Sequence, residues 1–281
     1  MTDKELREGF SGFLPEASSY EAITVEEDKD HESHVVLTQV EVEWDKKVPE
    51  FQSSLRNRIV EVPHEIYKAS GIKVFGKRIK SLLFSTDVAL IRNSNAGSVI
   101  AVYPFTPQSV IMQAIISCAS VPVFVGVGGG LTTGQRSVNL AFQAEQLGAY
   151  GVVVNAPMAP EVIAEIKAQV DVPVIATISS FADDFMAKKE AGADMFNVSG
   201  GSKTVELVRH LRHELGPEFP IIATGGPNGE SILATIEAGA NAITYTPPTT
   251  ADIFATVMDK YRDRVHDDEA RQEIVDEEAT K

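Results

Sequence analysis

The sequence has little cysteine, and its one thiol, Cys118, lies in an apolar run before a proline. A lone cysteine forms no internal disulfide, so we expect a cytoplasmic protein with a buried structural thiol. The sequence also lacks a long apolar run, because its most apolar stretch, residues 110–127, is broken by three polar residues and the proline. That stretch is too short and too interrupted to span a membrane. The first residues are acidic, which argues against a signal peptide.

A concentrated basic face is missing as well. The net charge is −15, but residues 1–50 carry 14 acidic and 5 basic side chains, and residues 263–281 carry 8 and 3. Residues 51–262 are nearly neutral, with 18 acidic and 17 basic side chains. Binding to nucleic acid requires lysines and arginines gathered on one face. We therefore expect neither nucleic acid nor a membrane as a partner.

The repeated pattern of residues 79–248 indicates the fold. Four apolar runs end in small or polar residues: Ile79–Ser85, Val121–Val127, Val172–Ile178 and Phe219–Gly225. A second set alternates with them: Ser98–Phe105, Tyr150–Pro157, Asp194–Gly201 and Asn241–Pro248. Such runs are typical of parallel strands that are covered on both faces.

Patterns of helical length lie between these strands. They cover Thr86–Ser94, Thr106–Ala119, Gly134–Leu147, Pro160–Val170, Ala182–Ala191, Thr204–Leu215, Ser231–Ala238 and Ala251–Tyr261. Eight alternations of strand and helix predict an α/β fold, a (β/α)₈ TIM barrel over residues 71–262. An open doubly wound sheet is the alternative.

Residues 1–70 lie outside the repeat and predict an N-terminal extension. His34–Trp44 alternates like a half-exposed strand, and residues 48–70 could hold one or two helices. The extension could cap the barrel, cover its mouth or pack on a second subunit, and we expect a homo-oligomer. Residues 263–281 predict a helix end that continues into an acidic tail.

Glycine-rich turns follow two neighbouring strands in the second half of the barrel. They contain Gly200-Gly201 with Lys203, and Gly225-Gly226. Glycines before a helix allow backbone N–H groups to approach an anion, which the helix dipole also favours. We predict a phosphate site there, because this half of a barrel often binds phosphate. The alternative is a pair of tight turns that need positive φ.

A longer glycine-rich loop, residues 126–134, follows the third strand. Gly128 and Gly129 lie in it, and Arg136 follows it. The loop could form a second anion site or a mobile lid, or it could be purely structural.

Few acid–base groups follow the predicted strands. Asp87 is the only carboxylate directly after one, and Asn155 and Asn197 lie near two others. Asp87 could act as a general base or as the N-cap of the next helix. The two asparagines could donate hydrogen bonds to a carbonyl or satisfy strand-end backbone. The six histidines all lie elsewhere, which argues against a histidine metal site or a Ser-His-Asp triad.

The segment from Asp194 to Thr249 resembles the phosphate-binding end of ribulose-phosphate-binding barrels, in particular the 2-keto-3-deoxy-6-phosphogluconate aldolase group. The resemblance rests on Phe196, on both glycine pairs and on Ala238-Gly239-Ala240. It implies phosphate binding at Gly225 and Gly226. Residues 245–248, Tyr-Thr-Pro-Pro, replace the Gly-Ser or Gly-Thr of that group.

The lysine of Schiff-base aldolases is missing from the sixth strand, which reads Asp-Met-Phe-Asn at residues 194–197. Residues 122–157 are similar in rhythm to the dihydrodipicolinate synthase group, whose lysine is also absent. We therefore predict an enzyme for a small phosphorylated metabolite, with lyase or isomerase chemistry and no Schiff base. A hydrolase and a non-catalytic metabolite-binding barrel are the alternatives. The sequence requires no cofactor, and it leaves room for a divalent metal at Asp87.

Overall fold

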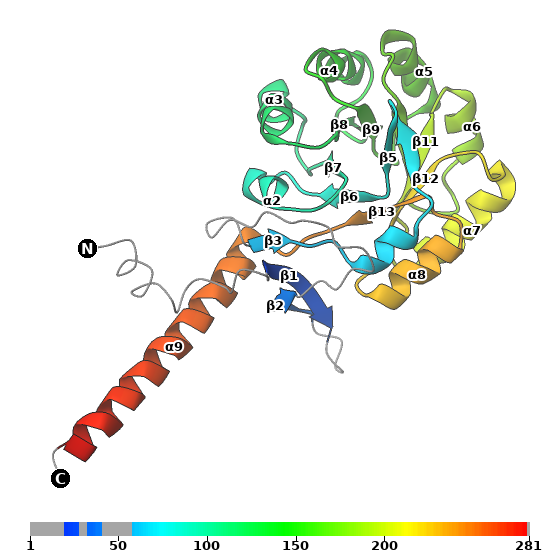
Figure 1. The fold of residues 1–281 in the computed structure, drawn as a ribbon. Coiled ribbons are helices and arrows are strands. Elements are labelled where there is room, and N and C mark those ends of the chain that lie inside the picture. The colour runs from blue at the N-terminus through cyan, green and yellow to red at the C-terminus, as the bar shows by residue number, and fades with distance from the viewer. Residues whose placement is uncertain (1–19, 28–32, 41–57, 280–281) are drawn as a thin grey trace. The chain divides into compact units, whose positions relative to one another are not determined.

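A computed structural model of the protein describes residues 20–27, 33–40 and 58–279. Its centre is a closed barrel of eight parallel strands, paired in the order β10-β11-β12-β13-β6-β7-β8-β9 (Figure 1). The strands are β6 (Ser81–Phe84), β7 (Ser98–Ala101), β8 (Val123–Gly128), β9 (Gly151–Val154), β10 (Val174–Ile178), β11 (Met195–Val198), β12 (Ile221–Thr224) and β13 (Ala242–Tyr245). The prediction of a (β/α)₈ barrel is confirmed, and the open sheet is excluded.

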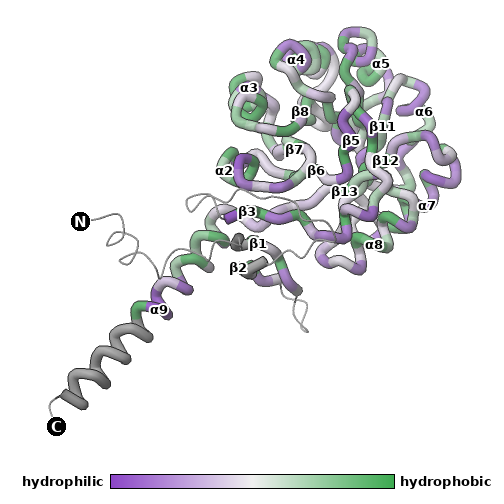
Figure 2. The backbone as a smooth tube through the Cα atoms, in the orientation of Figure 1, coloured by the Kyte–Doolittle hydropathy of each residue, from purple (hydrophilic) through white to green (hydrophobic). Residues whose placement is uncertain are grey.

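Helices α2 to α8 form a ring around these strands (Figure 1). They are α2 (Val88–Arg92), α3 (Ser109–Cys118), α4 (Gln135–Gln146), α5 (Pro160–Gln169), α6 (Phe185–Glu190), α7 (Thr204–Leu215) and α8 (Gly229–Glu237). A 3₁₀ turn, η2 (Gly201–Lys203), leads into α7. Hydrophobic and hydrophilic positions alternate along the helices in Figure 2, as expected for helices that bury one face.

Alternation along the strands divides the core into two layers. Side chains such as Val125, Val152 and Phe196 point outward and pack under the helices. Side chains of the opposite parity fill the barrel: Leu82, Ile100, Phe124, Val153, Ile175, Met195, Ile222 and Ala242. Because each strand places every second residue inward, the next inward positions toward the carboxyl ends are fixed by this pattern.

A short hairpin closes the amino end of the barrel. Strands β4 (Ile72–Val74) and β5 (Lys77–Ile79) pair antiparallel through a turn at Phe75-Gly76, where both φ angles are positive. Ile72, Val74 and Ile79 are buried against the inward apolar layer. The cluster of basic residues at 73–80 thus lies on and beside a hairpin that plugs the barrel, and the 3₁₀ turn η1 (His64–Lys68) precedes it.

The chain divides into two compact units, Val60–Pro247 and a second one made from residues before and after that span. In the second unit, β1 (Tyr20–Glu27) pairs antiparallel with β2 (Ser33–Val40). Helix α9 (Thr250–Ala279) belongs to the same unit, and Lys260 donates to the carbonyl of Leu37 at 2.9 Å. Strand β2 covers the described part of the predicted strand 34–44.

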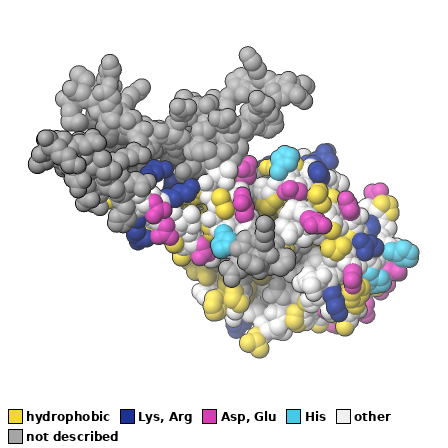
Figure 3. Space-filling model, turned by 90° about the horizontal axis from the view of Figure 1, so that it is seen from below, with side chains coloured by type: hydrophobic (Ala, Val, Ile, Leu, Met, Phe, Trp, Pro, Cys, Tyr) yellow, Lys and Arg dark blue, Asp and Glu magenta, His cyan; other side chains and the backbone are white. Residues whose placement is uncertain are grey.

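The remaining predictions for the extension are only partly within the described residues. Residues 41–57 lie outside them, and residues 58–70 hold β3 (Arg58–Val60) and η1. The last predicted helix, Ala251–Tyr261, lies within α9, which continues to Ala279. None of the helices in the described residues is both long and apolar enough to cross a membrane. On the face in Figure 3, basic side chains are interspersed with acidic ones.

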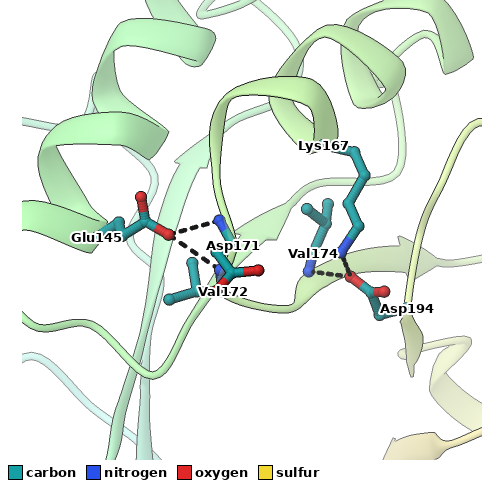
Figure 4. Close-up of polar contacts among 6 residues, drawn as sticks. All are labelled: Glu145, Lys167, Asp171, Val172, Val174 and Asp194. Atoms are coloured by element: carbon teal, nitrogen blue, oxygen red, sulfur yellow. Dashed lines mark hydrogen bonds and ion pairs between the residues drawn. The ribbon is translucent and has the colours of Figure 1, made fainter.

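Polar side chains fix the turns at the amino ends of the strands (Figure 4). Glu145 accepts hydrogen bonds from the N–H groups of Asp171 and Val172 at 2.6 and 3.0 Å. Asp194 accepts from the N–H of Val174 and from Lys167 Nζ, both at 2.8 Å. These contacts lie at the end of the barrel opposite the mouth and hold the loops that enter β10 and β11.

Candidate functional site

The inward positions nearest the carboxyl ends form the floor of the barrel mouth. They are apolar on β6 to β8 and polar but uncharged on β9 to β13: Phe84, Val102, Gly126, Asn155, Thr177, Asn197, Thr224 and Thr244. The register supports this placement, because Thr177 pairs with Asn197 and Thr224 pairs with Thr244. We call Thr177, Asn197, Thr224 and Thr244 the polar floor. It offers neutral donors and acceptors to whatever enters the mouth.

Two oxygens of the polar floor are buried without a hydrogen-bond partner among the described residues. They are Asn197 Oδ1 and Thr244 Oγ1. The Asn197 amide donates to Thr177 Oγ1 at 3.5 Å, the outer limit of a hydrogen bond. Thr244 is only 6% exposed. Buried polar groups are nearly always paired in folded proteins, so these two oxygens are exceptions within the described residues.

A pocket of about 200 Å³ opens at the ends of β7, β8 and β9, and no residue of the polar floor is among its lining residues. Tyr103, Thr106, Gly129, Thr132 and Asn155 are among its lining residues. The Tyr103 hydroxyl accepts a hydrogen bond from the N–H of Gln108 at 2.9 Å, which fixes the start of the β7–α3 loop. The structure thus brings Asn155 and the glycine-rich loop after β8 together.

Close packing explains two glycines of that loop. Gly128 and Gly129 have φ angles of +145° and +122°, and a Cβ on Gly129 would lie 2.5 Å from Asn155 Cβ. The carbonyl of Gly128 accepts the N–H of Asn155 at 2.8 Å. Arg136 is exposed on α4 and is not among the residues that line the pocket. The loop therefore positions Asn155, and a second anion site there stays a prediction.

The two turns predicted to bind phosphate leave the neighbouring strands β11 and β12. Gly201 and Gly226 have φ angles of +60° and +84°, and their N–H groups donate to no other described residue. Gly200 donates its N–H to Thr204 Oγ1 at 3.0 Å. A Cβ on Gly225 would lie 2.6 Å from Ile243. Glycine is therefore favoured at these turns by packing and by backbone conformation. The turns also have N–H groups without an acceptor among the described residues.

Asp87 is the N-cap of α2. Its Oδ1 accepts the N–H groups of Ala89 and Leu90 at 2.8 and 3.3 Å. The structure thus shows the capping role that the sequence left open, and a catalytic role for Asp87 remains a proposal. Among the described residues, no group of three or more histidine, cysteine, aspartate or glutamate side chains gathers in a way that could hold a metal ion.

Sequence reasoning missed Lys188, which lies on α6 and is only 4% exposed. Its Nζ donates to the carbonyls of Ala156 and Thr177 at 2.7 and 3.2 Å. Burial lowers the pKa of Lys188, and the nearby Asp183 and Asp184 oppose that shift. The contacts tie the ends of β9 and β10 together, next to Asn155 and the polar floor. In the sequence, the only signal for Lys188 is its position on the buried face of a short predicted helix.

The loop between β10 and α6 is held by Asp183. Its carboxylate accepts from the N–H groups of Ser179 and Ser180 at 2.7 and 3.0 Å, and from the Ser179 hydroxyl. Burial alone would raise the pKa of Asp183, but these hydrogen bonds and Lys188 lower it. Tyr245 points outward among the helices, and burial raises its pKa to about 12. Tyr245 therefore does not contribute to the mouth.

Comparison with known proteins gives one local sequence match and several likenesses of fold. No protein-family model matches the sequence. The chain is 50% identical over 60 residues to a deoxyribose-phosphate aldolase from Thermococcus gammatolerans. The match covers 20% of this chain and only 27% of the length of that aldolase.

Solved structures show the same fold at low identity. A putative phosphonomutase from Burkholderia cenocepacia is similar over 72% of this chain and 97% of its own, with a TM-score of 0.50 and 15% identity. A phosphonopyruvate hydrolase is similar over 69% and 84%, with a TM-score of 0.52 and 16% identity. A 4-hydroxy-tetrahydrodipicolinate synthase from Methylacidiphilum fumariolicum is similar over 66% and 70%, with a TM-score of 0.50 and 15% identity. These likenesses show that the chain shares the TIM-barrel fold of these enzymes.

Proposed function

We propose that this protein is an enzyme that binds a small phosphorylated metabolite in the mouth of the barrel. The phosphate binds at the turns Gly200-Gly201 and Gly225-Gly226, with Lys203 at the rim. The observation that carries the proposal is the position of these turns on adjacent strands, where two positive-φ glycines present N–H groups with no acceptor among the described residues. Such N–H groups before a helix are a common phosphate site.

The reacting carbon then lies over the floor of the mouth, near Asn155 and Asn197. Neutral amide donors stabilise negative charge that develops on a carbonyl or hydroxyl oxygen. Asp87, at the end of β6, is the proposed acid–base group. The chemistry is C–C or C–O bond cleavage or isomerisation without a Schiff base.

Two comparisons support this class of substrate without assigning a reaction. The local match is to a deoxyribose-phosphate aldolase, and the solved structures with this fold include a phosphonopyruvate hydrolase and a putative phosphonomutase. The names of the aldolase and of the hydrolase each give a substrate with a phosphorus-containing group. A homo-oligomer and a cytoplasmic location remain predictions from the sequence.

Turnover measured by proton and phosphorus NMR tests the proposal. The purified chain is incubated with aldose phosphates, ketose phosphates and phosphorylated keto acids, and we expect at least one to be converted. Asn197→Ala should then lower kcat/KM by about 10²–10³-fold, the usual effect of losing one such donor. Asn139→Ala, on the exposed face of α4, is the matched control and should leave the rate unchanged. Conversion of no compound, or full activity of Asn197→Ala, would refute the proposal.

A further inference from the structure

The polar floor contains a buried hydroxyl, Thr244 Oγ1, that the fold itself does not use. Thr244 lies on β13 with its side chain inside the barrel, since it pairs with Thr224 on one side and Leu82 on the other. Its hydroxyl has no hydrogen-bond partner among the described residues, and the residue as a whole is 6% exposed. A valine would fill the same space without burying a polar atom. The hydroxyl therefore lowers stability unless something in the mouth binds it.

A second unpartnered oxygen, Asn197 Oδ1, lies two strands away in the same floor. Its amide nitrogen donates one of its two protons to Thr177 and keeps the other for the substrate, and its oxygen is left as an acceptor for a donor in the mouth. A hydroxyl group satisfies such an acceptor because it donates one hydrogen bond and accepts others. A carboxylate cannot, since it only accepts.

The inward positions of the mouth carry no formal charge in the part of the chain that the structure describes. The basic groups near the mouth are placed differently: Lys203 is exposed in η2, and Lys188 donates to strand carbonyls. A carboxylate inserted onto the floor would lose its hydration and meet no cation, which is strongly unfavourable. Hydroxyl groups would lose less and would pair with the two buried oxygens.

We infer that the floor recognises the hydroxyl groups of a sugar phosphate, and that Thr244 and Asn197 determine this specificity against phosphorylated carboxylic acids. The inference rests on the proposed function, because the phosphate of the same molecule binds at the glycine turns. Thr244 accepts or donates to one substrate hydroxyl, and Asn197 Oδ1 accepts from another. The floor excludes a carboxylate at the same depth.

Calorimetric titration with three kinds of probe tests the inference: aldose and ketose phosphates of three to six carbons, phosphoenolpyruvate, and inorganic phosphate. We expect at least one sugar phosphate to bind ten-fold more tightly than inorganic phosphate, and phosphoenolpyruvate to bind no more tightly. Thr244→Val should remove this ten-fold preference and leave the affinity for inorganic phosphate unchanged. Thr244→Ser, which keeps the hydroxyl, should retain the preference within about two-fold.

Thermal unfolding without ligand separates recognition from folding. Thr244→Val should unfold at the same temperature as the wild type or at a higher one, because it removes an unpaired buried hydroxyl. Thr235→Val is the matched control: Thr235 is 1% exposed, and its hydroxyl donates to the carbonyl of Ser231 at 2.8 Å. This control should unfold at a lower temperature and keep the preference for the sugar phosphate.

The outcomes distinguish this inference from the proposed function. If inorganic phosphate binds but phosphoenolpyruvate binds more tightly than every sugar phosphate, the specificity is overturned and the phosphate site stands. If a sugar phosphate is preferred and Thr244→Val keeps the full preference, the role of Thr244 is overturned. If no probe binds, including inorganic phosphate, the proposed function fails and the inference fails with it.

Discussion

Lys188 donates from helix α6 to the backbone carbonyl of Thr177, at 3.2 Å, and the side chain of the same threonine belongs to the polar floor. A second hydrogen bond, 2.7 Å long, joins Lys188 to Ala156, the neighbour of Asn155. One buried ammonium thus fixes the ends of two strands that both contribute to the mouth. Lysine is well suited to this, because it presents three donors on a flexible stem.

Lys188→Met should change how stability depends on alkaline pH. The pKa of Lys188 is lowered by burial, so the unfolded chain binds more protons than the folded chain between that lowered pKa and 10.5. The contribution of Lys188 to the free energy of unfolding therefore rises with pH across this window, by at most about 1.4 kcal/mol per pH unit. The difference in stability between the wild type and the variant should therefore change in favour of the wild type as pH rises, when both are unfolded in urea at pH 7 to 10.5.

The control removes the same charge from the next helix position. Lys189 is only half-buried, and its Nζ lies 5.5 Å from the centre of the Phe219 ring. Lys189→Met should follow the wild-type dependence on pH. Parallel curves for the wild type and Lys188→Met would show that the buried amine does not lose its charge in this range.

Borohydride treatment tests the prediction that no Schiff base forms. Lys188 is the buried lysine nearest the strand ends among the described residues, and its Nζ is engaged by two carbonyls rather than directed into the mouth. We expect no increase in mass when the protein is reduced in the presence of an aldehyde phosphate or a keto acid. A reduced adduct on Lys188, located by peptide mass spectrometry, would contradict this account.

Gly129→Ala should disturb the position of Asn155. The new Cβ would lie 2.5 Å from Asn155 Cβ and 2.8 Å from its nitrogen, at a φ of +122°. We expect a loss of about 1–3 kcal/mol in the free energy of unfolding, together with weaker binding in the mouth. Gly130→Ala shares the positive φ, +82°, but its Cβ meets no atom within 4 Å. The Gly130→Ala control should lose stability and keep its affinity. Equal affinities for the two variants would show that the loop does not position Asn155 for binding.

The repeat of the barrel predicts a matched pair of stability effects. Asp194 accepts the N–H of Val174 at 2.8 Å, and Asn241 accepts the N–H of Ile221 at 2.9 Å in the equivalent place two strands later. Asp194→Ala and Asn241→Ala should each cost about 1–3 kcal/mol in urea unfolding, because a strand N–H loses its acceptor. Neither should alter ligand affinity, since both lie at the amino end. A change in affinity would mean that the two ends of the barrel are coupled.

The eight strands could be predicted from the sequence because each is an apolar run that ends in small or polar residues. The hairpin of β4 and β5 could not be predicted, because each strand has only three residues, which is too short for a recognisable alternation. Strand β1, at Tyr20–Glu27, was missed as well, because half of its residues are acidic or polar.

The site was predictable only in part. Asn155, Asn197 and the glycine turns could be predicted because each follows a predicted strand. The same reasoning named Asp87, whose carboxylate caps a helix. Thr244 could not be singled out from the sequence, because its burial and its lack of a hydrogen-bond partner appear only in three dimensions. Lys188 reaches the site from a helix, and its contacts depend on how α6 packs against β9 and β10.

Calorimetric titration of inorganic phosphate into three forms of the protein tests the central claim most directly. Gly201→Asp adds a negative charge at the proposed phosphate turn, where a side chain meets no atom within 4 Å and φ is +60°. Gly216→Asp adds the same charge at the opposite end of α7, with φ +74° and equally open space. We predict at least ten-fold weaker phosphate binding for Gly201→Asp and wild-type binding for Gly216→Asp. Equal binding by all three forms would contradict a phosphate site in the mouth of this barrel.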